Sequence, residues 1–117
     1  MANANDCLFC KIAQREIPSE IVYEDDRVVA FKDIAPQAPV HLLIIPRRHI
    51  ATLADIRPED AELIGHMHVV ATQLAEQHRV AESGYRAVIN CREDGQQSVF
   101  HLHLHLLGGR KMTWPPG

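Results

Sequence analysis

Three histidines, His101, His103 and His105, alternate with apolar residues near the carboxyl end of the chain. Strict alternation over residues 98–107 predicts a β-strand, in which side chains two residues apart share one face and lie about 7 Å from each other. We therefore expect a row of three imidazoles, with the intervening leucines turned into a core. Such a row can bind a metal, or one imidazole can act as a nucleophile while its neighbours stabilise charge. The alternative without chemistry is a half-exposed strand whose polar face happens to be histidine.

The loop before these histidines carries groups that suit an oxyanion. Its sequence, Gly95-Gln96-Gln97-Ser98, supplies backbone N–H groups, two side-chain amides and a hydroxyl. Hydrogen-bond donors that converge at such a place would suit a phosphate. The loop thus favours a nucleophilic histidine over a catalytic metal.

A second cluster of reactive side chains is the pair Cys7 and Cys10, spaced as Cys-x-x-Cys. One interpretation is two small buried hydrophobic residues, and another is metal ligation. A redox pair is disfavoured because no strand precedes the motif to begin a thioredoxin-like unit. Structural zinc takes four ligands, and His49 together with one end of the histidine row could complete the set.

The remaining histidines divide by position. His41 begins an apolar segment after a proline-containing loop, and it is either a partly exposed residue at a strand start or a part of the site. His66 and His68 fall on a predicted helix, where residues two apart point to different sides. We therefore expect that His66 and His68 do not share a metal.

Length and charge limit the classes of function. The chain has 117 residues, is 46% hydrophobic and 23% charged, and carries a net charge of −3. One domain is expected, and the charge argues against nucleic acid or an anionic membrane as a partner. No apolar run approaches the roughly 18 residues of a membrane helix, and the first residues do not resemble a secretory signal. We therefore expect a cytoplasmic protein whose cysteines stay reduced.

The elements that must position these residues follow from periodicity and from breaks in it. Proline and two acidic residues favour a helix start at residue 58, and an apolar stripe continues the helix to about residue 80. The order of the elements predicts an α+β fold with one long helix on a five-stranded, mainly antiparallel sheet. The predicted ranges are a short helical turn at 7–15, strands at 21–24, 28–31, 41–46, 85–90 and 98–107, and the helix at 58–80.

Together these segments resemble the histidine triad (HIT) superfamily, and more narrowly its Hint branch in the bacterial form that carries Cys-x-x-Cys. The resemblance covers nearly the whole chain. It rests on CLFCKI, REIPSEIVYEDDRVVAFKDIAPQAPVHLLIIPRRHI, Asn90 at a strand end, GQQSVFHLHLHLLGGRKM and the closing WPPG. It implies a single HIT domain over 1–117 and a homodimer whose two sheets join into one of ten strands. It also implies a tail, 110–117, that reaches toward the partner subunit.

The resemblance further implies a purine nucleoside phosphoramidase. Such an enzyme hydrolyses nucleoside 5′-phosphoramidates, such as adenosine 5′-monophosphoramidate or AMP joined to lysine, through a nucleotidyl-histidine intermediate. By position, His103 would be the nucleophile, Ser98 would serve the leaving amine, His105 would hold phosphoryl oxygens, and His41 would line the site. No metal is needed for this chemistry.

The nucleotide contacts implied by the resemblance come from both halves of the chain. Asp33 could accept hydrogen bonds from both ribose hydroxyls, since a carboxylate has two acceptor oxygens. Gln96 stands where eukaryotic Hint proteins carry a glycine, which leaves the leaving-group preference open. The full set is Leu8, Phe9, Phe31, Asp33, Ile34, Leu43, Asn90, Gln96, Gln97, Ser98, His103 and His105.

The resemblance also implies a structural zinc held by Cys7, Cys10, His49 and His101, which removes His101 from catalysis. Three alternatives remain open. The chain could be a nucleotide-binding adaptor with incidental hydrolysis, or a hydrolase of dinucleoside polyphosphates. A metallohydrolase with catalytic zinc is disfavoured, because the histidine row contains no carboxylate.

Overall fold

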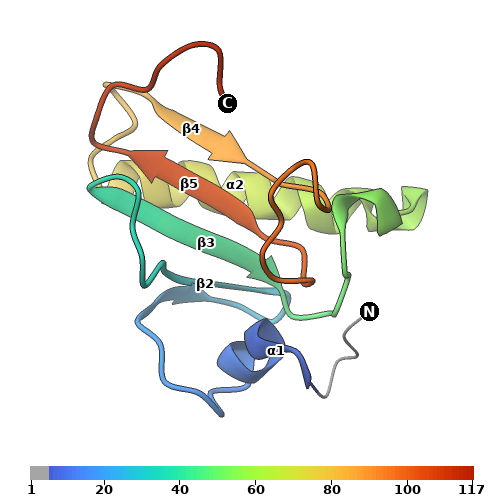
Figure 1. Ribbon diagram of the computed structural model, residues 1–117. Coiled ribbons are helices and arrows are strands. Elements are labelled where there is room, and N and C mark those ends of the chain that lie inside the picture. Colours follow the sequence, from blue (N-terminus) through green and yellow to red (C-terminus); the bar gives the residue numbers. More distant parts are fainter. Residues whose placement is uncertain (1–5) are drawn as a thin grey trace.

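Five strands form one antiparallel sheet in the order β1-β2-β3-β5-β4 (Figure 1). The computed structural model describes residues 6–117. Its element order confirms the predicted α+β fold. The elements are α1 (Leu8–Ala13), β1 (Ile21–Glu24), β2 (Val28–Lys32), β3 (Val40–Pro46), α2 (Ala61–Gln77), β4 (Tyr85–Val88) and β5 (Leu104–Gly108), with short 3₁₀ turns at Leu53–Asp55 and Pro58–Asp60.

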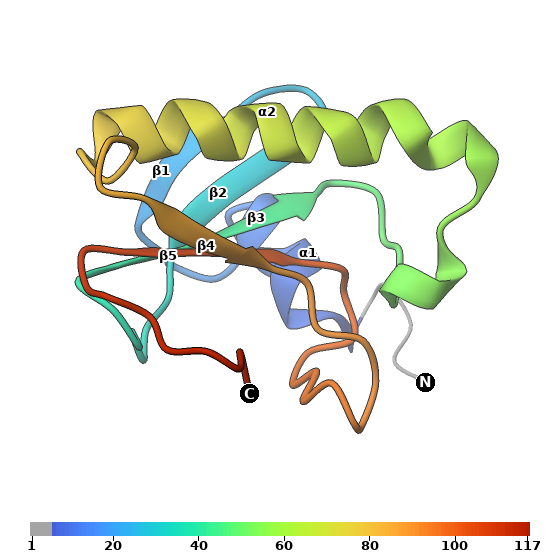
Figure 2. The same cartoon turned by 90° about the horizontal axis from the view of Figure 1, so that it is seen from above.

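The sheet separates two hydrophobic cores, because successive side chains of a strand point to opposite faces. Helix α2 covers one face, and the short helix α1 lies on the other (Figure 2). Val28 and Ala30 of β2 pack in the core under α2, whereas Val29 and Phe31 pack with α1. The same alternation continues through β3 and β5, and it puts the buried Leu104 and Leu106 under α2. The histidines between these leucines therefore fall on the face that carries α1.

Helix α2 is shorter than predicted at both ends. The first turn, Pro58–Asp60, is a 3₁₀ turn, and the α-helix ends at Gln77. Arg79 has a φ of 61°, a left-handed conformation that cannot continue a right-handed helix. The predicted apolar stripe is confirmed, since Met67, Val70 and Leu74 are fully buried.

The final strand is the main departure from the predicted boundaries. It begins at Leu104 rather than at residue 98, and residues 98–103 have no regular structure. The register pairs Ile44 with Leu104, so a continued ladder would bring Pro46 opposite Leu102. Pro46 has no N–H to donate, and its carbonyl oxygen instead accepts a hydrogen bond from Nε2 of His101 at 2.7 Å. The pairing of β3 with β5 therefore ends at the point where the side chain of His101, instead of a backbone N–H, donates to the carbonyl oxygen of Pro46.

The other boundaries differ from the prediction by one or two residues, with α1 at Leu8–Ala13 instead of 7–15 and β2 ending at Lys32 instead of residue 31. The third strand begins at Val40, one residue before the prediction, and β4 ends at Val88 rather than at residue 90. The last residues, 114–117, lie outside regular structure, as their prolines predict. None of the helices in the described part of the chain is long and apolar enough to span a membrane.

Candidate functional site

The predicted row of three imidazoles is split between two sites. Because β5 begins only at Leu104, His101 lies in an irregular segment and turns toward the cysteines. The rings of His103 and His105 stay together, with centroids 4.9 Å apart. The prediction of one continuous row on a strand was therefore wrong. The prediction that the leucines between the histidines face the core is confirmed.

His103 is held in one orientation by the backbone beside it. Its Nδ1 donates to the carbonyl oxygen of His101 at 2.7 Å, which leaves Nε2 with a free lone pair. The ring of Phe9 lies edge-on to it at 5.0 Å. Burial lowers the pKa of His103 from its ordinary value, although the bond to His101 and the charge of Asp33 oppose the shift. His103 is thus a buried, neutral imidazole with a fixed tautomer.

A cavity of about 320 Å³ opens beside His103, within the size range of small-molecule sites. Its walls come from α1 and the segment after it, from the end of β2, from β3 and from the histidine segment. Nine of the predicted nucleotide contacts line this cavity: Leu8, Phe9, Phe31, Asp33, Ile34, Leu43, Ser98, His103 and His105.

The sequence analysis missed further residues of the same cavity wall. Ile17, Pro18 and Ser19 follow the first helix, and Lys32 lies beside the predicted Asp33. These four positions lie within the segment that carries the family resemblance, but their residue types do not by themselves indicate a ligand contact. The wall is completed by Ile12 and Val99.

Three predicted contacts lie outside the lining of this cavity. Asn90 is half-buried beyond the end of β4, and Gln96 is exposed with a φ of 64°. Gln97 is buried, and its side chain is engaged with the backbone around it. Its Oε1 accepts from the N–H of Arg92 at 2.8 Å, and its Nε2 donates to the carbonyl oxygens of Ala51 and Val99 at 2.8 and 3.0 Å. The amide of Gln97 therefore braces the loop that carries Ser98.

His41 lies behind the cavity and is buried, so it is not the partly exposed strand-start residue considered above. Its Nε2 is 2.9 Å from Nδ1 of His105 and 3.4 Å from Oδ2 of Asp33. Burial lowers the pKa of His41, against the effect of Asp33. Burial, together with His103 and His41, lowers the pKa of His105 to about 4. Both imidazoles are therefore neutral at neutral pH.

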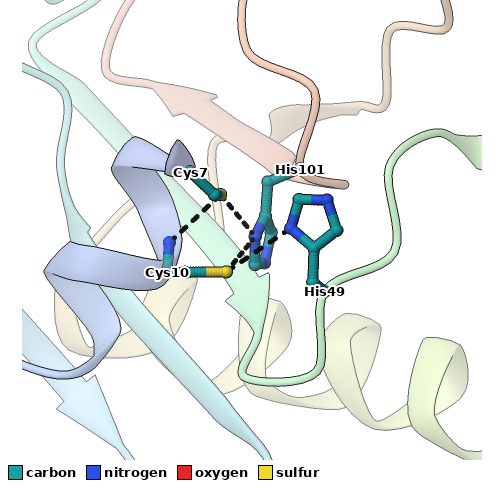
Figure 3. A group of neighbouring side chains, drawn as sticks. All are labelled: Cys7, Cys10, His49 and His101. Carbon is teal, nitrogen blue, oxygen red and sulfur yellow. Dashed lines mark hydrogen bonds between the residues drawn. The ribbon is translucent and has the colours of Figure 1, made fainter. Parts of the chain in front are cut away.

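The four predicted metal ligands come together in space from three separate segments (Figure 3). The Sγ of Cys7 lies 3.2 Å from Nδ1 of His101. The Sγ of Cys10 lies 3.4 Å from Nδ1 of His101 and 3.4 Å from Nδ1 of His49. All four ligand atoms lie within 4.8 Å of one another. In tetrahedral zinc, Zn–S near 2.3 Å and Zn–N near 2.0 Å put sulfur and nitrogen about 3.5 Å apart, so the donor set fits.

The surroundings of this cluster also favour metal binding. His101 donates through Nε2 to Pro46, so the lone pair of Nδ1 faces the two sulfurs, which is the usual arrangement of a histidine ligand. Burial and the neighbouring Cys7 raise the pKa of the Cys10 thiol to about 12. A bound cation would offset the cost of forming thiolates there.

The other histidines do not join either cluster. His66 donates to Asp25 at 2.7 Å, and His68 donates to the carbonyl oxygen of Ile64 at 2.8 Å. The two rings therefore point to different partners, His66 to the β1–β2 turn and His68 to the backbone of its own helix.

Comparison with known proteins agrees with this geometry. A family model described as the C-terminal binding region of the scavenger mRNA decapping enzyme matches residues 6–114. A purine nucleoside phosphoramidase of Escherichia coli K12 is 51% identical, over 93% of this chain and 92% of that protein.

Two crystal structures show the same fold. A HIT family hydrolase of Legionella pneumophila superposes with a TM-score of 0.94 at 56% identity, covering 96% of this chain and all of that one. A histidine triad protein of Clostridium difficile gives 0.91 at 46% identity, covering 97% of each chain. The chain therefore belongs to the histidine triad (HIT) superfamily and, within it, to the Hint branch.

Proposed function

We propose that this protein hydrolyses purine nucleoside 5′-phosphoramidates to the nucleoside monophosphate and an amine, with adenosine 5′-monophosphoramidate and AMP-lysine as typical substrates. The observation that carries the proposal is His103, whose Nδ1–H is held by the carbonyl oxygen of His101 while its ring lines the cavity. The name of the Escherichia coli relative supports the same activity.

The first step is attack of the His103 Nε2 lone pair on phosphorus. The P–N bond to the amine breaks, and its electron pair leaves with the amine nitrogen, which takes up a proton that Ser98 can relay from solvent. His103 keeps its Nδ1–H bond to His101, so the carbonyl oxygen faces the positive charge of the nucleotidyl-histidine. Water then attacks phosphorus, the electrons of the N–P bond return to Nε2, and a proton is released.

The cavity also suits the rest of a nucleoside monophosphate. Leu8, Phe31 and Leu43 offer an apolar surface for the base. Asp33 lies in the same wall with a carboxylate that can accept from two ribose hydroxyls. The apolar wall and the single carboxylate thus favour a nucleoside over a simple phosphate ester.

The cysteine and histidine cluster is proposed to hold a structural zinc. When bound, zinc would tie α1, His49 and the segment before β5 together at their thiolate and imidazole ligands. The nucleophile in this proposal is His103, so the hydrolysis needs no cofactor. A cytoplasmic location would keep both cysteines reduced and able to bind the metal.

A homodimer is part of the same proposal. The strand order leaves β4 at the edge of the sheet, where Tyr85 is exposed, so a second copy could extend the sheet to ten strands. In the tail 110–117, Trp114 is 82% exposed, and burial against the partner subunit would remove this apolar surface from water.

The test is intact-protein mass spectrometry during turnover of adenosine 5′-monophosphoramidate. Wild type should show a transient adduct of AMP mass and release ammonia, and His103→Gln should show neither. His68→Gln changes an exposed histidine on α2 and serves as the matched control, which should behave as wild type. Absence of adduct and ammonia in folded wild type that binds AMP would refute the proposal and favour a nucleotide-binding adaptor.

A further inference from the structure

The backbone N–H of Gln37 points at the buried ring of His41. It donates to Nδ1 of His41 at 3.0 Å. Because a backbone N–H can only donate, Nδ1 must carry the lone pair, and the proton of the neutral ring then sits on Nε2. One main-chain amide thus determines the tautomer of His41.

The tautomer of His41 in turn determines that of His105. The Nε2–H of His41 faces Nδ1 of His105 at 2.9 Å. Two N–H groups cannot face each other at this distance, so Nδ1 of His105 must accept the hydrogen bond. The proton of neutral His105 then sits on Nε2.

Two further contacts agree with this direction. The carboxylate of Asp33 can only accept and lies 3.4 Å from Nε2 of His41, so this longer contact is compatible with a proton on that nitrogen but does not fix it. The Nε2 of His105 is buried and has no hydrogen-bond partner among the described residues. A buried donor without a partner is costly, and a ligand oxygen in the cavity would satisfy it.

We propose that the backbone amide of Gln37 acts as a positioning group that fixes the protons of His41 and His105, so that His105 offers Nε2–H to a phosphoryl oxygen. The proton positions follow from the free protein, whereas the phosphoryl oxygen as acceptor rests on the proposed function. A fixed donor of this kind needs no reorganisation when negative charge builds up on the phosphoryl group.

Hydrogen bonding also distinguishes the two clusters of potential metal ligands. Asp33, His41 and His105 also lie close enough to share a metal ion. A metal in this cluster would need the lone pair of Nε2 of His41. Because the N–H of Gln37 donates to Nδ1, the proton of the neutral ring occupies Nε2, and that lone pair is not available. At His101, by contrast, the Nε2–H donates to the carbonyl oxygen of Pro46, so the lone pair of Nδ1 stays available to a metal.

The proton positions are tested by ¹⁵N–¹H NMR of the histidine side chains in the full chain at neutral pH. Wild type should show His41 and His105 both protonated only at Nε2. In Gln37→Pro, which removes the N–H, His41 should shift toward the Nδ1–H form. Gln37→Ala keeps the N–H and should keep the wild-type pattern. An Nδ1–H or doubly protonated His105 in wild type, or an unchanged pattern in folded Gln37→Pro, would overturn the inference.

Kinetics test the consequence for the reaction. Gln37→Pro should lower kcat by about tenfold or more, up to the roughly 10²–10³-fold cost of losing one oxyanion donor, with little change in KM. Adding His41→Gln to Gln37→Pro should restore much of the lost kcat, since an amide N–H₂ donates near the Nε2 position without help from residue 37. Adding His41→Phe should not.

These measurements separate the two proposals. If wild type has no phosphoramidase activity, the proposed function fails while the NMR spectrum still decides the proton positions. If wild type is active but its His105 is not the Nε2–H form, this inference alone fails. If Gln37→Pro does not fold, the wild-type spectrum still tests the proton positions. Two single variants, His41→Gln and His41→Phe, then replace it. Only His41→Gln should keep His105 in the Nε2–H form.

Discussion

The carbonyl oxygen of His101 accepts a hydrogen bond from Nδ1 of His103 at 2.7 Å, while the imidazole of His101 turns away toward Cys7. The candidate metal ligand and the candidate nucleophile are therefore connected through a single residue. A change that shifts the backbone of His101 would therefore alter both the position of its ring and the acceptor that fixes the tautomer of His103.

We expect Cys10→Ser to lose bound zinc, to lower the melting temperature and to lower kcat. Zinc that binds only the folded state stabilises it by about 3 kcal/mol when its free concentration exceeds Kd a hundredfold. Cys91→Ser is the matched control, because Cys91 is a free cysteine outside the cluster. Elemental mass spectrometry and thermal denaturation measure the effect. Equal metal content in wild type and Cys10→Ser would contradict the assigned ligands.

The loop before Ser98 leaves no room for a side chain at Gly95. A Cβ there would lie 2.6 Å from the carbonyl oxygen and 2.7 Å from the nitrogen of Cys91. Gly95→Ala should therefore destabilise the protein by about 1–3 kcal/mol and reduce kcat, because backbone atoms cannot move aside cheaply. Gly65→Ala is the control. It lies in α2 with nothing within 4 Å of its Cβ, so it should stabilise by about 0.5–1 kcal/mol in urea unfolding.

Asp25 connects the β1–β2 turn to α2. Burial opposes its charged form, but hydrogen bonds from His66, Tyr23 and two backbone N–H groups hold the pKa of Asp25 well below its usual range. A carboxyl whose pKa is lower in the folded state stabilises the protein above its unfolded pKa, near 3.9, and this stability is lost as the pH falls through the folded pKa.

Asp25→Asn should therefore cost roughly 2 kcal/mol of unfolding free energy at pH 7. The difference from wild type should shrink progressively as the pH falls below about 4, because the unfolded chain takes up the proton there while folded wild type keeps Asp25 ionised to much lower pH. The exposed neighbour variant Asp26→Asn should differ little from wild type at any pH. A pH-independent cost of Asp25→Asn, measured by urea unfolding, would argue against the ionic role.

The buried His105 should make the protein sensitive to mild acid. Its pKa is lowered to about 4 by burial, by His103 and by His41, while Asp33 acts in the opposite direction. Since the unfolded histidine takes up a proton near pH 6.5, stability should fall as the pH drops from about 6.5 to 4, by up to about 3 kcal/mol from this residue. His105→Gln should show a shallower loss over that window in urea unfolding. An identical pH slope would show that His105 does not titrate as its burial implies.

The fold could be predicted from the sequence because apolar side chains on both faces of the strands pack into the two cores. Val28 to Phe31 alternate between the two cores, and a strand pattern of this kind specifies its own faces. The end of the ladder at Leu104 could not be predicted. It depends on Pro46 and on the ring of His101, which are 55 residues apart in the chain.

Within the site, the residues that take part were easier to predict than the hydrogen bonds that they make. Cys7, Cys10, His49 and His101 lie together in the structure, as the predicted set of metal ligands requires. The role of Gln97 could not be predicted, since an amide beside a phosphate loop and an amide that braces the loop look the same in sequence. The hydrogen bond from the backbone N–H of Gln37 to His41 could not be predicted, because nearly every residue type has a main-chain N–H.

The two-faced sheet has a practical consequence for engineering. Phe31 and Leu43 form part of the cavity wall, whereas their neighbours Ala30 and Leu42 pack under α2. Substitutions at the first pair can reshape the cavity without touching the contacts that anchor the long helix. Cavity shape and scaffold integrity are thus encoded at alternate positions of the same strands, and a library restricted to every second residue would vary one while leaving the other intact.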